Sequence, residues 1–343
     1  MNPGIVGTSL VDILPQPDTP GGPWKVYALS RRALPPWCKP SSASVIPIQV
    51  DLTDFTAVAE ALTQLTDITH VFYVAWMLHS TEAQNREKNS AMFRNVISFV
   101  VTNCPGLVHI SLQTARAALY RGHAAPGLPQ EDILFDEVSR RGGDVGWSVH
   151  RPSLIFGFSP RSFFNTVCSL CVYAAICRKE GATLRWPGSL ASWEECSNAS
   201  DADLVAEQHI WAGLEPMAKN EAFNCCNGDV YRWKQLWPIL AERFGLEWTG
   251  YTGEENRFKV AEAMVGKEAV WAEIVKENEL LETQLCEVAN WWLVDNLVNE
   301  LGANWKLLDS MNKSKEHGFL GFRNTVKSFN GWIDKMKARK IVP

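Results

Sequence analysis

Short apolar segments alternate with longer amphipathic segments through the first half of the chain. A helical pattern opens at Thr8 and stops at a proline- and glycine-rich loop over residues 15–23. Apolar runs bounded by polar residues then predict strands, and segments of helical periodicity between them predict helices. The predicted strands cover residues 24–29, 45–50, 70–76, 107–113 and 146–150, and the predicted helices cover 55–64, 81–102 and 130–140. This alternation indicates an α/β fold with a Rossmann-like, doubly wound parallel sheet.

The pattern becomes more helical and less regular beyond Pro160. We therefore expect a Rossmann domain over residues 1–160 and a C-terminal α-rich lobe over residues 161–343, with some strands of the lobe returning to the main sheet. The longest apolar stretch, residues 166–177, is too short to cross a bilayer. Its pattern favours a buried helix, and we expect no membrane association.

Composition and charge exclude several classes of protein. The chain has 343 residues, 46% of them hydrophobic, which is enough for a substantial core. Its net charge is −5 and no long basic run is present, so we expect no nucleic-acid partner. The N-terminus lacks the basic and apolar regions of a secretory signal.

The nine cysteines are scattered along the chain and suggest no disulfide framework. Cys168 and Cys171 have the spacing of a redox or metal pair, but they lie in an apolar helical run, which favours buried packing. Neither the cysteines nor the seven histidines show the spacing of a metal site, so we expect no metal. A reducing, cytoplasmic setting fits this usage best.

Polar and glycine positions at successive strand ends indicate a dinucleotide site. Glycines at the start of a helix let backbone amides approach a diphosphate, and here the segment is Gly4, Ile5, Val6 and Gly7. Arg31 and Arg32 follow the next strand, where arginines favour the 2′-phosphate of NADP. Asp51 closes the following strand and suits an adenine contact. Each feature has an alternative explanation. The glycines are also typical of a terminal turn, the arginines of a solvated basic turn, and Asp51 of a helix N-cap.

Several motifs in order along the chain resemble the plant progesterone 5β-reductase and iridoid synthase family of extended short-chain dehydrogenases. They are Gly4–Gly7, Ser30-Arg31-Arg32, VFYVAW at 71–76, HISLQT at 109–114, HRPSLIFGFSP at 150–160, DADL at 201–204, NGD at 227–229 and SMNKSKEHGFLGF at 310–322. The similarity covers nearly the whole chain. It implies NADPH-dependent 1,4-reduction of small apolar enones or enals, and it leaves a homodimer open.

The resemblance also implies roles for individual residues. Residues matching the cofactor-binding positions are Gly4, Ile5, Val6, Gly7, Arg31, Arg32, Asp51, Leu52, Thr114, Pro152, Ile155 and Ser162. Trp76, Phe319 and Phe322 match the substrate pocket, although aromatic residues of this kind are equally common in a core. His150 and Arg151 end a strand and favour a role in fixing the loop on the cofactor side.

The chain departs from the family pattern at its catalytic positions. Relatives carry a lysine where this chain has Ala117, and a tyrosine that falls on Gly127 or Leu128 in a shortened segment. Hydride addition at the β-carbon creates an enolate, which needs a donor at the carbonyl oxygen. Loss of one such donor costs about 2.7–4 kcal/mol, roughly a hundred- to thousandfold in rate. Tyr120 or His123 is a weak substitute, so a catalytically silent paralogue that binds cofactor or a small apolar ligand is the alternative.

A second departure concerns the start of the sheet. Relatives begin with an apolar strand ahead of the glycine motif, whereas here Met1 stands three residues before Gly4. That strand is central in such a sheet and pairs on both sides. We therefore expect two open strand edges, poor solubility of the chain as written, and rescue by an added N-terminal strand.

Overall fold

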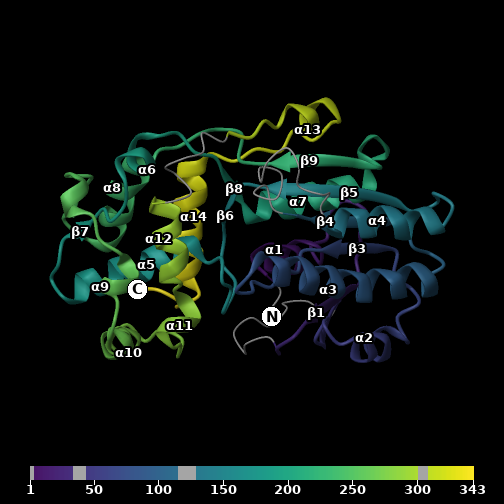
Figure 1. Ribbon diagram of the computed structural model, residues 1–343, viewed down its shortest axis with the longest axis horizontal. Coiled ribbons are helices and arrows are strands. Elements are labelled where there is room, and N and C mark those ends of the chain that lie inside the picture. The colour runs from purple at the N-terminus through teal and green to yellow at the C-terminus, as the bar shows by residue number, and fades with distance from the viewer. Residues whose placement is uncertain (1–3, 34–43, 115–128, 300–307) are drawn as a thin grey trace. The chain divides into compact units, whose positions relative to one another are not determined.

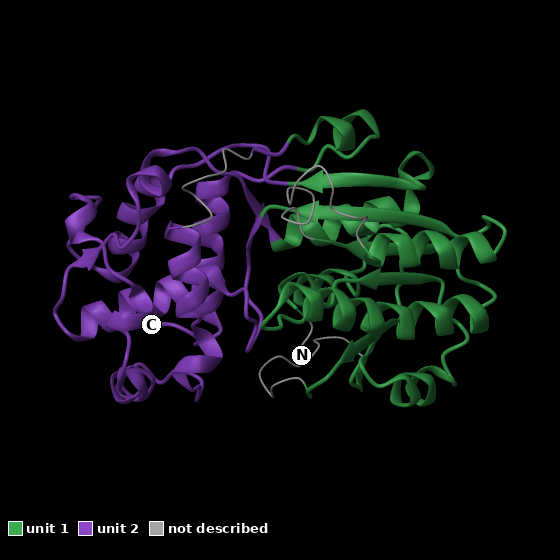
Figure 2. Cartoon of the chain, in the orientation of Figure 1, with its two compact units in different colours: residues 1–153, 202–225, 310–321 green, residues 154–201, 226–309, 322–343 purple. Residues whose placement is uncertain are grey.

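The computed structural model describes residues 4–33, 44–114, 129–299 and 308–343 (Figure 1). These residues form two compact units, each assembled from three segments of the chain (Figure 2). Unit 1 comprises residues 1–153, 202–225 and 310–321, and unit 2 comprises residues 154–201, 226–309 and 322–343. No helix among the described ranges is both long enough and apolar enough to span a membrane.

Unit 1 contains the parallel sheet that the sequence predicts, which confirms the Rossmann-like fold. Four strands are hydrogen-bonded in the order β3 (His70–Tyr73), β4 (His109–Gln113), β5 (Gly146–Pro152) and β9 (Glu221–Cys225). The strands β1 (Val26–Ser30) and β2 (Val45–Gln49) form a separate parallel pair. Among the described residues β1 pairs only with β2 and β3 pairs only with β4, so each has one edge without a strand partner.

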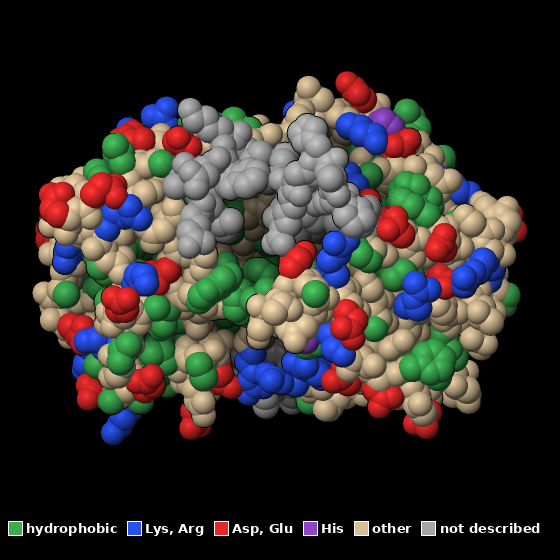
Figure 3. All heavy atoms as spheres, in the orientation of Figure 1, with side chains coloured by type: hydrophobic (Ala, Val, Ile, Leu, Met, Phe, Trp, Pro, Cys, Tyr) green, Lys and Arg blue, Asp and Glu red, His purple; other side chains and the backbone are tan. Residues whose placement is uncertain are grey.

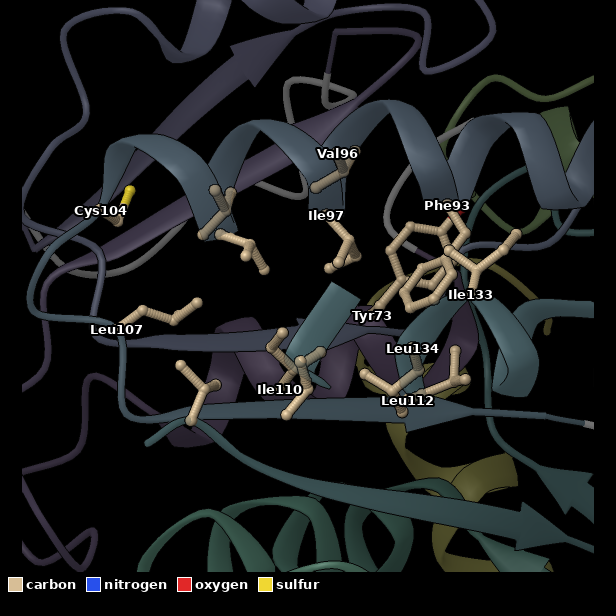
Figure 4. Close-up of a cluster of buried hydrophobic side chains, with 14 of the residues drawn as sticks. Tyr73, Phe93, Val96, Ile97, Cys104, Leu107, Ile110, Leu112, Ile133 and Leu134 are labelled. Atoms are coloured by element: carbon tan, nitrogen blue, oxygen red, sulfur yellow. The ribbon is translucent and has the colours of Figure 1, made fainter. Parts of the chain in front are cut away.

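Helices cover both faces of this sheet. The helices α2 (Phe55–Leu62), α3 (Glu82–Asn103) and α4 (Pro129–Arg140) pack on one face, and α1 (Ile5–Ile13) and α7 (Ala202–Leu214) pack together on the other. Alternate strand residues point to opposite faces, so Ile110, Leu112 and Val149 enter the apolar core under α3 and α4. Figure 4 shows this core, with Phe93 and Ile97 of α3 pointing toward the strands.

The opposite face of the sheet is polar where it meets α7. His109 and Ser111 of β4 and Ser148 and His150 of β5 are buried there, each 4% exposed or less. The short elements η2 (Pro216–Ala218) and α13 (Asn312–Glu316) complete unit 1. Ser314 of α13 accepts a hydrogen bond from Gln208 Nε2 on α7 at 3.0 Å, which connects the C-terminal segment to this polar layer.

Unit 2 is mainly helical, with two small parallel strand pairs. The pairs are β6 (Leu154–Phe156) with β8 (Ala199–Asp201), and β7 (Leu184–Arg185) with β10 (Trp248–Thr249). The helices are α5 (Thr166–Lys179), α6 (Leu190–Glu194), α8 (Trp233–Phe244), η3 (Glu254–Asn256), α9 (Val260–Ala263), α10 (Glu268–Glu277), α11 (Leu285–Val288), α12 (Trp291–Asn299) and α14 (Thr325–Ala338). The apolar stretch that predicts a buried helix is α5, whose Cys168 and Cys171 are fully buried.

A cluster of tryptophans fills part of the core of unit 2. The Trp186 ring lies 5.1 Å from Trp193, 6.0 Å from Trp233 and 5.1 Å from Trp237, measured between ring centroids. Trp193 in turn lies 6.3 Å from Trp248, which is 43% exposed. Offset and edge-to-face contacts at these distances stabilise aromatic pairs beyond simple burial.

A buried carboxylate anchors the C-terminal helix of unit 2. Asp201, at the end of β8, accepts hydrogen bonds at Oδ2 from Ser328 Oγ at 2.5 Å and Trp332 Nε1 at 3.1 Å. Both donors lie on α14, one turn apart. A carboxylate that is 5% exposed needs such partners, so this contact fixes α14 against β8.

Candidate functional site

The predicted diphosphate site is the start of α1. Gly4 precedes the helix in an extended conformation, and the first helical bond runs from the Thr8 amide to the Gly4 carbonyl oxygen at 2.8 Å. The amides of Ile5 to Gly7 precede that bond and are free for an anion, as at any helix start. The first turn contains no acidic residue to compete. A Cβ added to Gly4 would lie 3.6 Å from the Val74 carbonyl oxygen, so the helix begins just beyond the end of β3.

Arg31 and Arg32 follow β1, as the pattern predicts. Ser30 Oγ donates to the Arg32 carbonyl oxygen at 2.9 Å and closes the turn. Arg32 is exposed, while Arg31 is half-buried and places Nη1 3.2 Å from the Met77 sulfur. A thioether is a weak acceptor and carries no charge, so the contact with Met77 does not neutralise the guanidinium of Arg31. The carboxylate of Asp51 interacts with the Arg31 charge as well. These two side chains can therefore receive a phosphate.

Asp51 and Leu52 follow β2. Asp51 Oδ1 accepts hydrogen bonds from the Thr53 amide at 3.0 Å and the Thr53 hydroxyl at 2.8 Å. Burial acts to raise the pKa of Asp51, but the bonds from Thr53 and the charge of Arg31 hold it below its ordinary value. The helix N-cap that was the alternative for Asp51 is supplied instead by Asp54, which accepts from the Ala57 amide.

The carboxyl ends of β4 and β5 carry a second polar group. Arg151 Nη2 donates to both carboxylate oxygens of Glu131 on α4, at 3.0 and 2.9 Å, and Thr114 Oγ1 lies 3.4 Å from Glu131 Oε1. The Gln113 Oε1 and Arg151 Nε atoms are buried and have no hydrogen-bond partner among the described residues. Such groups fit a polar ligand better than a closed core. Together with the first turn of α1 and the arginines, these residues fit a nicotinamide dinucleotide.

The remaining predicted residues have different surroundings. In unit 1, Pro152 is buried in β5, Trp76 is half-buried after β3, and Phe319 is 6% exposed with its ring 5.2 Å from Trp211. In unit 2, Ile155 lies in β6, Ser162 Oγ accepts from the Phe164 amide at 3.3 Å, and Phe322 is 69% exposed. Ala117, Tyr120, His123, Gly127 and Leu128 lie outside the described residues.

Sequence reasoning missed the buried polar layer under α7. His150, expected to fix a loop on the cofactor side, instead donates and accepts within this layer: Nδ1 lies 2.8 Å from Gln208 Oε1 and Nε2 lies 3.0 Å from Ser148 Oγ. Ser111 Oγ joins His209 Nδ1 at 2.7 Å. Burial lowers the pKa of His109 to about 3 and that of His150 to about 4. The alternation of polar residues at 109, 111, 148 and 150 was the available signal.

Surface charges, a pocket and side chains of metal-ligating types also lie outside this site among the described residues. Acidic and basic side chains are interspersed over the face shown in Figure 3. A pocket of about 870 Å³ in unit 2 is lined by residues of η3, α9 and α12, and none of the predicted site residues lines it. Within the part of the chain that the structure describes, no three His, Cys, Asp or Glu side chains are grouped as metal ligands.

Comparisons with known proteins agree with this architecture. Residues 124–343 match the family model of the PRISE-like Rossmann-fold domain. The chain is 50% identical to the (S)-8-oxocitronellyl enol synthase of Nepeta cataria and 49% identical to the 3-oxo-Delta(4,5)-steroid 5-beta-reductase of Arabidopsis thaliana. Each alignment covers 99% of this chain and 91% of the relative.

Solved structures show the same fold at low sequence identity. An epimerase from Methanothermobacter thermautotrophicus has a TM-score of 0.65 at 13% identity, over 98% of this chain and 91% of that chain. The Bordetella bronchiseptica enzyme WbmG, solved with NAD and UDP, has a TM-score of 0.61 at 14% identity, over 100% of this chain and 97% of that chain. These similarities concern the fold alone.

Proposed function

This chain belongs to the progesterone 5β-reductase and iridoid synthase family of Rossmann-fold oxidoreductases, and we propose that it reduces the conjugated double bond of small apolar enones or enals with NADPH. The observation that carries the proposal is its near-full-length similarity to an enol synthase and a steroid 5-beta-reductase, at 50% and 49% identity. A cytoplasmic location and a homodimer stay predictions.

The cofactor part of the proposal rests on unit 1. The first-turn amides of α1, from Ile5 to Gly7, would hold the diphosphate, and Arg31 and Arg32 would hold the 2′-phosphate that distinguishes NADPH from NADH. Asp51 and Leu52 would border the adenine. The half-buried guanidinium of Arg31, whose Nη1 lies 3.2 Å from the uncharged Met77 sulfur, supports this assignment.

The family resemblance assigns Thr114, Pro152, Ile155 and Ser162 to the nicotinamide end of the cofactor. The bound cofactor would supply a hydride to the β-carbon of the substrate. The same resemblance assigns Trp76, Phe319 and Phe322 to the apolar part of the substrate. The Glu131 carboxylate, paired with Arg151 and close to Thr114, would keep the ends of β4 and β5 in register for this contact.

The positions that supply the proton donor for the substrate carbonyl oxygen in relatives differ in this chain. Ala117 occupies the position of the lysine in relatives, and Tyr120 and His123 are the substitutes within reach along the sequence. Without a donor, the enolate oxygen would be left to water, and we expect a rate roughly a hundred- to thousandfold below that of a complete site. This observation favours the second candidate function, a silent paralogue that binds cofactor or a small apolar ligand.

One experiment separates the two candidates. The purified protein is mixed with NADPH and, in turn, a Δ4-3-ketosteroid, a monoterpene dialdehyde and a small cyclic enone. NADPH consumption is followed by absorbance, and the product is identified by mass spectrometry. We expect slow formation of a product two hydrogens heavier, and loss of activity in an Arg31→Ala/Arg32→Ala variant at limiting NADPH.

Binding is measured in parallel by calorimetry. NADPH binding without turnover of any of the three substrates would support the silent paralogue. Equal affinity for NADPH and NADH, or unchanged NADPH affinity in the double arginine variant, would contradict the assignment of Arg31 and Arg32. No binding of either cofactor would overturn the reductase, and it would leave the silent paralogue only as a protein that binds a small apolar ligand.

A further inference from the structure

The segment after β3, residues 74–80, has no helix or strand, yet its backbone is held by side chains of α3. Asn89 Oδ1 accepts from the Met77 amide at 2.8 Å, and Asn89 Nδ2 donates to the Met77 carbonyl oxygen at 2.8 Å. Asn85 Oδ1 accepts from the His79 amide at 2.6 Å. Both backbone groups of Met77 are thereby paired as they would be in a sheet.

Both asparagines are buried, and their spacing suits this contact. Asn85 and Asn89 are 8% and 1% exposed and stand one helical turn apart, so they share one face of α3. Asn89 Nδ2 also donates to the Asn85 carbonyl oxygen at 2.8 Å, which uses both of its hydrogens. The Asn89 carbonyl oxygen accepts from Gln130 Nε2 at 3.3 Å, which connects the start of α4 to the same point.

The held segment touches two of the proposed cofactor contacts. Its first residue, Val74, lies beside Gly4 at the start of α1, where a Cβ added to Gly4 would be 3.6 Å from the Val74 oxygen. Its Met77 sulfur lies 3.2 Å from Nη1 of Arg31. The Met77 side chain therefore connects the held segment to the half-buried guanidinium of Arg31.

We propose that Asn89 is a positioning residue for cofactor selection: by holding both backbone groups of Met77 it places the Met77 sulfur under Arg31, and so aims the guanidinium at the 2′-phosphate. This inference rests on the proposed use of NADPH. Asn89 does not touch the cofactor. Asn85 restrains the far end of the same segment through His79.

The substitution Asn89→Asp tests the contact with little change in shape. A carboxylate still accepts from the Met77 amide, but it cannot donate to the carbonyl oxygens of Met77 and Asn85, and it repels both. We expect NADPH affinity to fall about tenfold and NADH affinity to change by less than about threefold, because NADH has no phosphate for Arg31 to meet. A tenfold loss is a modest change for misplacing one charged hydrogen-bond donor.

Calorimetric dissociation constants for NADPH and NADH are measured for the unchanged protein, Asn89→Asp and Met77→Leu. The matched control is Asn103→Asp, on the same helix, where the exposed Asn103 donates only to the Phe99 carbonyl oxygen of its own turn. Asn103→Asp should keep the NADPH-to-NADH affinity ratio. Met77→Leu keeps the size of the side chain and removes the sulfur, and it should lower the ratio in the same direction as Asn89→Asp.

Hydrogen exchange supplies a readout that does not need cofactor. The amides of Met77 and His79 should be protected in the unchanged protein, and the Met77 amide should exchange faster in Asn89→Asp while the core strand β4 stays protected. If Asn89→Asp proves too unstable to assay, Asn85→Ser and Met77→Leu give the same comparison. An unchanged affinity ratio in Asn89→Asp and Met77→Leu would overturn this inference alone. Failure of the unchanged protein to bind NADPH would overturn the proposed function with it.

Discussion

The hydroxyl of Ser148 lies at the centre of the polar layer under α7 and fixes the protons of its neighbours. It lies 2.9 Å from His109 Nε2, 3.0 Å from Ser111 Oγ and 3.0 Å from His150 Nε2. A hydroxyl donates one hydrogen bond and accepts two, so only one neighbour can be an acceptor. The direction of each bond follows from the ends of the network.

Gln208 provides the starting point, because its Nε2 donates to the Asn224 carbonyl oxygen at 3.1 Å. Its Oε1 must then accept from His150 Nδ1–H, which leaves His150 Nε2 as the acceptor of the Ser148 proton. Ser148 accepts in turn from His109 Nε2–H and from the Ser111 hydroxyl, and Ser111 accepts from His209 Nδ1–H. Burial lowers the pKa of His109, His150 and His209, so each ring is neutral at pH 7, and for neutral rings these bonds assign one tautomer to each.

This neutrality predicts sensitivity to acid. Burial holds the pKa of His109 at about 3, that of His150 at about 4 and that of His209 well below its ordinary value, whereas the unfolded chain takes up these protons near pH 6.5. Because the folded pKa values are lower, the unfolded state binds more protons below pH 6.5 and stability falls there. Each histidine contributes up to about 1.4 kcal/mol per pH unit between pH 6.5 and its folded pKa.

Urea unfolding at pH 7, 6 and 5 measures this loss. The substitution His209→Gln keeps a hydrogen-bond donor for Ser111 and removes one titrating group. As the pH is lowered, the free energy of unfolding of this variant should therefore fall less steeply than that of the unchanged protein. The difference in slope should correspond to about one bound proton. His317→Gln is the control, since half-buried His317 follows the short helix α13 outside the polar layer, where its Nδ1 lies 2.8 Å from the Lys313 carbonyl oxygen and its ring 5.4 Å from that of Phe223. Equal slopes for His209→Gln and the unchanged protein would contradict the prediction.

At the scale of elements, a buried carboxylate helps to hold the C-terminal helix α14, whose first residue Thr325 is also bonded by Asp229. The substitution Asp201→Asn removes the charge that accepts from Ser328 Oγ and Trp332 Nε1. Hydrogen bonds to a charged group contribute about 1.5–3 kcal/mol, so we expect the free energy of unfolding to fall by about 2 kcal/mol. Asp334→Asn is the control on the same helix, because Asp334 is 60% exposed and its ion pair with Arg243 lies at the surface.

Comparison of urea midpoints for the two variants decides the matter. The control should lose much less stability than Asp201→Asn. Similar losses in both would mean that the buried position of Asp201 does not matter, and that the helix is held by its apolar face.

The elements also show how far the sequence could predict this fold. The helix expected at 130–140 is α4, Pro129–Arg140, because its apolar periodicity and acidic first turn are local signals. The strand expected to reach Trp76 ends at Tyr73 instead. Residues 74–77 are apolar enough for a strand, but the Asn89 side chain takes the Met77 backbone groups that a ladder would use. Asn89 lies twelve residues after Met77 in the sequence, so no local pattern around residues 74–77 indicates this competition.

At the scale of the molecule, the two units are interleaved along the chain. The sequence predicts a boundary at residue 160, with some strands of the C-terminal lobe returning to the main sheet. In the structure, unit 1 also includes residues 202–225 and 310–321. These segments carry α7, β9 and α13, which cover and extend the sheet. The composition changes near Pro160 because unit 2 begins there, but nothing local marks the return of the chain to unit 1.

A fragment of residues 1–160 should therefore not fold alone. It would lack β9, which pairs with β5, and α7, which supplies Gln208 and His209 to the polar layer. The four polar side chains of β4 and β5 in this layer would lose the helix that buries them. Each buried group left without a hydrogen-bond partner costs about 1–3 kcal/mol, whereas the free energy of unfolding of a typical domain is about 5–15 kcal/mol. Circular dichroism melts should show no cooperative transition for the fragment and a clear one for the full chain. A cooperative melt of the fragment would contradict this dependence.

The tryptophan cluster of unit 2 has an optical consequence. Indole rings whose centroids are 5.1 to 6.3 Å apart exchange excitation energy, so light absorbed by any of these five rings is emitted from the set. Trp248, at 43% exposure, is the member that water and added quenchers reach. A quencher titration therefore reaches this cluster through Trp248, and a rise in quenching would report that the four buried rings have become exposed.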